Sequence, residues 1–154
     1  MAQYKITPTI TASPNYGALD VLGTGNPYKL NSIVARQGRH VIVQSVSVTD
    51  YSAQAPGINM YFFDVDPTNS TFTDNSALAI HADDWDNCVG HLVLVSSDYT
   101  ASDGNHRILT QKDIGLELGT SATGDLWVVF QTIATPNFDA VDNVIIRINV
   151  VPSS

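Results

Sequence analysis

The densest group of side chains able to bind a metal or act in catalysis lies between residues 81 and 91. It comprises His81, Asp83, Asp84, Asp86, Cys88 and His91. Imidazole, thiolate and carboxylate groups are the ligands that zinc prefers. The run nevertheless contains neither a Cys-x-x-Cys pair nor a His-Glu-x-x-His pair, which are the spacings that bring such ligands together. A short helix explains it better, with Asp83 as its cap, residues 84–89 as its body and Gly90 as its end. We therefore predict a helix of one or two turns and no metal site.

A second oxygen-rich segment follows a predicted strand. Asp64, Asp66, Asn69 and Thr71 offer oxygen atoms of the kind that calcium prefers. Their spacing departs from that of a calcium-binding loop, and Pro67 blocks the usual path of the chain. Asp and Asn side chains also cap backbone N–H groups in turns. The sequence favours such a turn and leaves calcium binding undecided.

Signals of catalysis are weak. Residues 119–124 (GTSATG) resemble a nucleophile elbow, but the last glycine comes one residue too late and no helix follows. The four histidines show no arrangement with a nucleophile that the sequence alone reveals. We predict a non-enzymatic protein with no catalytic residue and no cofactor.

Composition limits the class of protein and its partners. The 154 residues carry a net charge of −8, and fourteen of the fifteen acidic residues are Asp. Asp favours turns, whereas Glu favours helices. With seven Lys and Arg residues, the chain offers no clustered basic surface for nucleic acid. We expect a soluble protein made in a cytoplasm, without a signal peptide, a membrane segment or a disulfide, since Cys88 is the single cysteine.

Short runs rich in Val, Ile and Thr, separated by Asp, Asn, Gly and Pro, predict strands. In the run from 39 to 50, apolar residues fall on both alternating faces, which predicts a central strand partly buried on both sides. We expect one all-β domain over residues 1–154: an antiparallel β-sandwich or jelly-roll-like fold of eight or nine strands with one short helix. The predicted strands are 3–11, 39–50, 58–65, 91–96, 107–111, 114–118, 126–135 and 143–151.

Two segments are candidates for binding a partner. Residues 1–12 form either an extended arm that adds a strand to a neighbour's sheet or the first strand of the chain's own sheet. Trp85 lies beside charged residues and is a candidate surface contact, whereas Trp127 lies in an apolar run and is predicted to be core. The residues assigned to partner binding are Tyr4, Ile6, Thr9, Ile10 and Trp85.

The run from 61 to 75 (YFFDVDPTNSTFTDN) resembles a family of small virion proteins of tailed phages. Residues 4–11 (YKITPTIT), 41–50 (VIVQSVSVTD), 114–118 (IGLEL) and 135–138 (TPNF) are also similar to that family, so the resemblance extends over most of the chain. It implies a structural role as a capsid decoration, or cement, protein on the outer surface of the phage head. The implied partner is the major capsid protein, and a homotrimer would suit a three-fold position of the capsid.

Two other functions stay open at this point. Small β-sandwich lectins share this composition, and exposed aromatic and Asp or Asn side chains are suited to sugars. A tail or baseplate subunit would differ from a decoration protein in its location on the particle.

Overall fold

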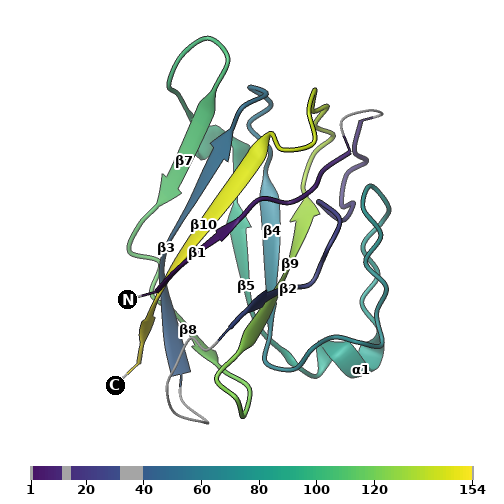
Figure 1. Ribbon diagram of the computed structural model, residues 1–154, viewed down its shortest axis with the longest axis vertical. Coiled ribbons are helices and arrows are strands. Elements are labelled where there is room, and N and C mark those ends of the chain that lie inside the picture. Colours follow the sequence, from purple (N-terminus) through teal and green to yellow (C-terminus); the bar gives the residue numbers. More distant parts are fainter. Residues whose placement is uncertain (1, 12–14, 32–39, 154) are drawn as a thin grey trace.

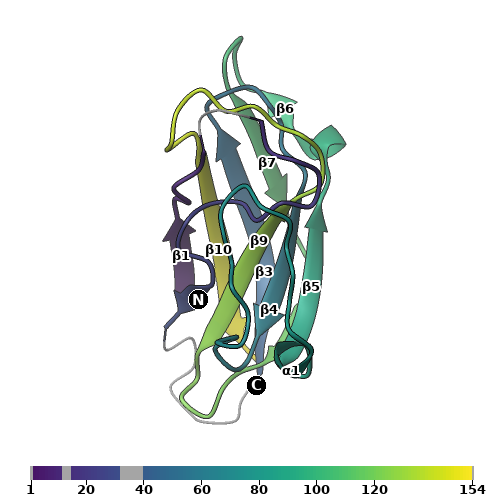
Figure 2. The ribbon, with the colours of Figure 1, turned by 90° about the vertical axis from the view of Figure 1, so that its right-hand side faces the viewer.

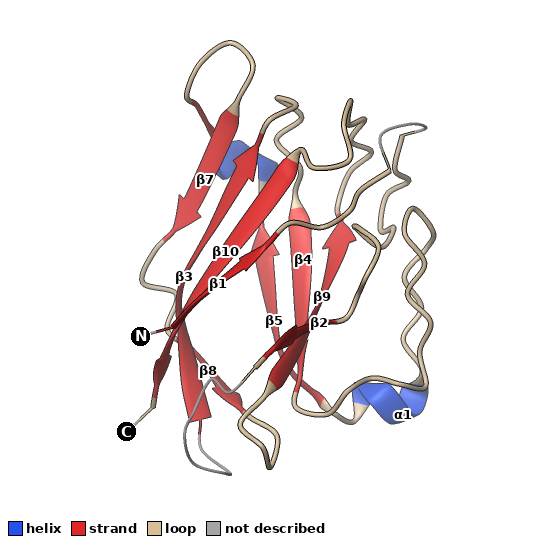
Figure 3. Cartoon of the chain, in the orientation of Figure 1, coloured by secondary structure: helices blue, strands red, loops and turns tan. Residues whose placement is uncertain are grey.

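The computed structural model describes residues 2–11, 15–31 and 40–153, and these form two antiparallel sheets packed face to face (Figures 1 and 3). The six-stranded sheet contains β1 (Ala2–Ile6), β10 (Val144–Pro152), β3 (His40–Asp50), β7 (Arg107–Gln111), β6 (Thr100–Ala101) and β8 (Leu116–Gly119). The four-stranded sheet contains β2 (Tyr28–Leu30), β9 (Leu126–Thr132), β4 (Ile58–Phe63) and β5 (Cys88–Leu94). A four-residue helix, α1 (Ala82–Trp85), and a 3₁₀ turn, η1 (Ser96–Asp98), complete the described elements. The predicted all-β sandwich is confirmed; the very short strands β2 and β6 were not predicted. No helix within the described ranges is long and apolar enough to cross a membrane.

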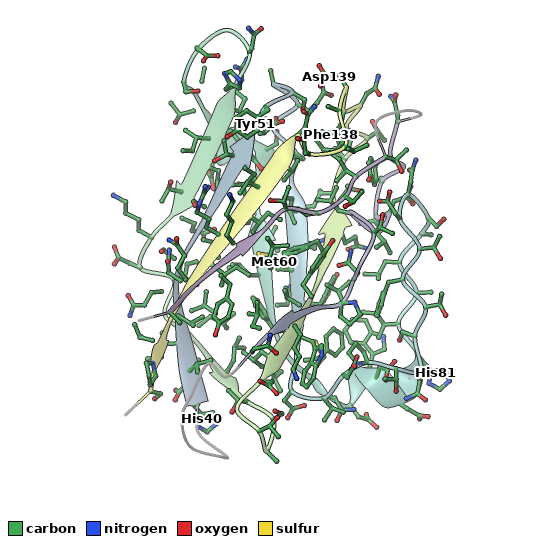
Figure 4. The ribbon with its side chains drawn as sticks, viewed as in Figure 1. His40, Tyr51, Met60, His81, Phe138 and Asp139 are labelled. Atoms are coloured by element: carbon green, nitrogen blue, oxygen red, sulfur yellow. The ribbon has the colours of Figure 1, made fainter. Side chains whose placement is uncertain are left out.

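The core lies between the two sheets and follows from the alternation of side chains along each strand. In β10 the even-numbered residues from Val144 to Val150 are at most 1% exposed, while the odd-numbered residues face outward. In β4 the same alternation buries Ile58, Met60 and Phe62. Figure 4 shows Met60 in the middle of the layer between the sheets. Burial of these branched and aromatic side chains is the main contribution to stability.

Strand β3 is central, as predicted, but only one of its faces is fully buried. A bulge at Gln44 breaks the alternation, because Ser45 pairs with Asn149 while Val43 pairs with Val150. The valines on both sides of the bulge, Val41, Val43, Val46 and Val48, therefore all point into the core at 0% exposure. Most outward residues of β3 are of intermediate exposure, in agreement with the predicted partial burial on both faces, but the bulge changes which residues share a face.

The bulge also marks a change of partner along one edge of β3. Strand β7 pairs with Val46–Asp50, and β8 pairs with residues 40–43. Between them, the Ile114 backbone N–H donates to the Gln44 carbonyl at 3.0 Å. One long strand thus holds two short ones in succession.

The N-terminal segment belongs to the chain's own sheet. Residues Ala2–Ile6 pair with β10 from Val150 to Ile146, and Ile6 and Ile10 are 8% and 2% exposed. Of the two alternatives for residues 1–12, the described part, 2–11, therefore takes the strand and not the free arm; residues 1 and 12 lie outside the described ranges.

A long connection between β4 and β5 covers the outer face of the four-stranded sheet (Figure 2). Phe63 and Val129 point to that face, yet both are 0% exposed. The connection is tied to the preceding segment by the Asp74 carboxylate, which accepts hydrogen bonds from the Thr11 and Tyr16 hydroxyls and the Gly23 N–H at 2.6–2.7 Å. One side of the sandwich is thereby closed by residues 64–81.

Candidate functional site

An aromatic cluster of Trp85, Tyr61 and His91 lies at the edge of the outer face of the four-stranded sheet, which residues 64–81 cover. The Trp85 side chain is 47% exposed and contacts Tyr61 edge to face, with ring centroids 5.7 Å apart. Tyr61 in turn stacks on His91 at 4.7 Å. The Tyr61 hydroxyl and the Asn59 amide both donate to Gln131 Oε1, at 3.2 and 2.9 Å. The predicted exposure of Trp85 is confirmed. The Asn59 and Gln131 amides near the rings are already hydrogen-bonded to each other.

The histidines, cysteine and carboxylates between residues 81 and 91 do not converge. The cap of α1 is His81, whose Nδ1 accepts from the Asp83 N–H at 3.2 Å, so the predicted Asp83 cap is wrong. The helix also ends at Trp85, because Cys88–Leu94 pairs with β4 and is a strand. In Figure 4, His81 points away from the body of the protein, far from His40. No three His, Cys, Asp or Glu side chains in the described ranges lie close enough together to hold a metal.

Asp84 holds the long connection in place. Its side chain is 1% exposed, and its two carboxylate oxygens accept from Asn69 Nδ2 at 3.0 Å and Ser70 Oγ at 2.5 Å. Burial by itself would raise the pKa of Asp84, but these hydrogen bonds outweigh it and lower the pKa below its ordinary value of 3.8. Asn69, one of the possible calcium ligands, is thus committed to a structural contact.

A groove of about 460 Å³ opens at the end of the sandwich where the chain leaves β4 and enters β9. Phe63, the last residue of β4, pairs with Trp127 of β9, so the chain that follows passes alongside the indole ring. The groove is lined by Asp64, Val65, Asp66, Thr120, Ser121, Ala122, Thr123 and Trp127. In Figure 1 the β8–β9 loop that forms one wall lies at the bottom of the molecule.

Trp127 is therefore not the core residue that was predicted. It lies on the outer face of β9 and is half-buried, while its neighbours Leu126 and Val128 are 0% exposed. Lys29 Nζ lies 5.3 Å from the centre of the Trp127 ring and forms an ion pair with Asp125 at 3.1 Å. An apolar run is compatible with burial on both faces of a strand, and the sequence does not show which face is covered.

Asp64 is the polar group of this groove that lacks a full set of partners. Its Oδ1 atom is shielded from solvent and accepts no hydrogen bond from the described residues. Burial raises the pKa of the Asp64 carboxyl above its ordinary value. An unpaired buried acceptor costs free energy that a suitable donor recovers.

The opposite side of the sandwich presents an open sheet. The outward side chains of the six-stranded sheet are exposed or half-exposed, so no described segment covers them. They are mostly small or uncharged: Gln3, Ile42, Ser45, Ser47, Thr49, Ile108, Thr110, Ile145, Asn149 and Val151. Lys5 pairs in register with Arg147 on this face, and Glu117 is the acidic residue that its strands turn outward.

The N-terminal residues assigned to partner binding are only partly available. Ile6 and Ile10 are buried in the chain's own core and have no side-chain surface to offer. Tyr4 packs against the same core and donates from its hydroxyl to the Asn31 carbonyl at 2.7 Å. Thr9 is exposed and bridges to Thr24. These residues were predicted to bind a partner, but the pairing of β1 with β10 turns alternate residues of this segment inward.

Sequence reasoning missed Asp64, Ser121 and Trp127 as neighbours in one groove. The signal available was the hairpin-like loop 119–124 and an Asp directly after a strand. Their proximity depends on the pairing of β4 with β9, which no local pattern specifies.

Comparison with known proteins assigns the chain to no family. No protein-family model matches the chain, and no curated protein matches it. A solved structure described as "Structure of infectious bursal disease virus Gt strain" aligns over 99% of this chain and 42% of the other chain, at 15% identity and a TM-score of 0.17. This chain thus spans less than half of that viral chain, and a likeness this weak carries no argument.

Proposed function

We propose that the chain is a non-enzymatic structural protein of a tailed-phage particle that binds the outer surface of the head and stabilises it. The observation that carries this proposal is the open outer face of the six-stranded sheet. It is poor in charge and carries Lys5 beside Arg147 in a protein of net charge −8. The resemblance of residues 61–75 to small virion proteins of tailed phages, an expectation from the sequence, favours the same function.

The charge distribution indicates which surface such a face fits. Most carboxylates of the chain lie in loops, and Asp50, the other acidic residue of these strands, is buried at 0% exposure. An acidic patch on a capsid subunit would complement Lys5 and Arg147 and orient the approach. The Ser and Thr hydroxyls around that pair carry no charge and can hydrogen-bond to a partner surface, so burying them costs less than burying charged groups.

The size of the face favours several copies acting together. Four strands of about seven residues span roughly 15–20 Å by 23 Å at ordinary strand spacing. This area is below the roughly 800 Å² that each partner buries in a stable interface. A homotrimer placed where three capsid subunits meet would multiply the weak contact of one copy. Light scattering after size exclusion, over a concentration series, measures whether the chain forms such a trimer.

The docking face is tested by a matched pair of substitutions. Thr110→Glu places a carboxylate on the open face, at a position of β7 that lies opposite Ser47 of β3, and Thr73→Glu places one on an exposed site of the covered side. Each purified variant is mixed with phage heads lacking the protein and sedimented. We expect Thr110→Glu to weaken head binding by about tenfold or more, because an interfacial charge without a partner costs over ~1.4 kcal/mol. Thr73→Glu should bind as the parent does.

Two outcomes would overturn the proposal. If the parent protein sediments with isolated tails and not with heads, it is a tail or baseplate component. If both Glu variants bind heads as the parent does, the open face is not the docking surface.

A further inference from the structure

We propose that the groove beside Trp127 is a binding site for a neutral saccharide unit of a glycan. This site is separate from the docking face and does not depend on it. Its lining comes from two segments far apart in the sequence, residues 64–66 and residues 120–123, together with Trp127.

The shape and composition of the groove fit a sugar ring. Its volume of about 460 Å³ accommodates one ring with its substituents. One part of the lining is aromatic or aliphatic, from Trp127 and the exposed Val65 (48% exposed). A pyranose ring has an apolar C–H face that packs on an indole, and a rim of hydroxyls that needs polar partners.

The polar partners that the groove offers are hydrogen-bond acceptors. The Asp64 carboxylate has an oxygen that accepts no hydrogen bond from the described residues, so a sugar hydroxyl reaching it after a small rotation would supply the missing donor. The Thr123 hydroxyl donates to Asp125 Oδ2 at 2.7 Å and lies 2.9 Å from Ser121 Oγ, which leaves Thr123 Oγ1 one lone pair for a further donor. A ligand with several hydroxyl donors matches this set.

The walls are held rigidly before any ligand arrives. Ser121 Oγ accepts from the N–H groups of Thr123 and Asp125 at 3.2 and 3.0 Å. The Ser121 N–H donates to the Asp125 carbonyl at 3.0 Å, which closes the loop. On the other wall, the Asp64 N–H donates to the Asn87 carbonyl at 3.1 Å. Preorganisation of this kind reduces the entropy lost on binding.

The charge around the groove selects against anionic sugars. Asp64 and Asp66 line it, and the nearby Lys29 is neutralised by its ion pair with Asp125. A sialic acid or uronic acid would meet two carboxylates, and the described residues of the lining offer no compensating cation. The site therefore fits neutral hexoses or N-acetylhexosamines.

The test is a titration of the ¹⁵N-labelled full chain, followed by NMR, with methyl glucoside, methyl galactoside, methyl mannoside and N-acetylglucosamine. We expect at least one sugar to shift the amide signals of residues 64–66 and 120–127, with a dissociation constant of about 1–10 mM, the range of a dozen-atom ligand. Val65→Glu should abolish these shifts by filling and charging the groove. Val141→Glu, a matched change at a 53% exposed valine outside the lining, should leave them unchanged.

A second variant guards against loss of folding. Asp64→Asn keeps the size of the side chain, and we expect it to weaken sugar binding several-fold, because a carboxylate acceptor is about twice as strong as an amide. The inference is overturned if no sugar shifts these signals at about 50 mM, well above the expected range. It is also overturned if the shifts gather around Trp85 and His91, or if N-acetyl-lysine methylamide shifts the groove signals more than every sugar. Head binding by Val65→Glu is measured in parallel and should equal that of the parent, so failure of this site is distinguishable from failure of the docking face.

Discussion

Replacing Asp84 by Ala should release the long connection that closes one side of the sandwich. Asp84 is the buried acceptor for Asn69 and Ser70, at 3.0 and 2.5 Å. A hydrogen bond to a charged group contributes about 1.5–3 kcal/mol, and part of this is recovered when water reaches the freed donors. We therefore expect the free energy of unfolding to fall by about 2–4 kcal/mol, measured by urea denaturation.

The control is a carboxylate on the same helix. Asp83 has a side chain that is 74% exposed and lies 3.6 Å from His81 Nδ1. Asp83→Ala should change the free energy of unfolding by less than about 0.5 kcal/mol. Hydrogen exchange should show faster opening of residues 64–81 in Asp84→Ala only. Equal losses of stability in the two variants would refute the role given to Asp84.

The same contact predicts a pH dependence. The pKa of Asp84 is lower in the folded chain than its ordinary value of 3.8. A lowered pKa means that the unfolded chain binds the proton more readily, so stability from this group is present above pH 3.8 and is lost as the pH falls through the folded value. The difference in stability between the parent and Asp84→Ala should therefore be constant near neutral pH and shrink in acid.

Two further changes test the core. Gly90→Ala places a Cβ 2.3 Å from Leu118 Cδ2, a buried methyl of the facing sheet, and should lower the free energy of unfolding by about 1–3 kcal/mol in thermal denaturation. Gly104→Ala has no heavy atom within 4 Å of the added Cβ and should be neutral. Deleting residues 2–11 removes β1 and two core isoleucines, so circular dichroism should show an unfolded or aggregated chain. If the deletion variant is folded and has lost only head binding, residues 2–11 act as a partner-binding arm and not as a strand that the fold needs.

The predictions that succeeded rest on local chemistry. The Val-, Ile- and Thr-rich runs separated by Asp and Gly correctly predicted most strands, because alternation and turn residues act over a few positions. Trp85 was correctly predicted to be exposed, because it stands among charged residues. The short helix was predicted in the right place, although its cap and its end were wrong.

The failures share a cause, which is the choice of partner between distant segments. Local spacing shows where Asp83 and His81 lie in a turn but not which side chain reaches the free N–H group. It shows that Trp127 lies in an apolar run but not that only one side of β9 packs against the second sheet.

The sequence by itself determined the fold class and the turns, since strand propensity and alternation are properties of neighbouring residues. Tertiary structure alone decided the bulge at Gln44, which appears in the pairing of β3 with β10 and lies where β7 gives way to β8 on the other edge of β3. It also decided that Asp84 is a buried acceptor, and that Asp64 and Trp127 share one groove. These features depend on contacts between residues tens of positions apart, and the free energy of such contacts is realised only when the whole sandwich closes.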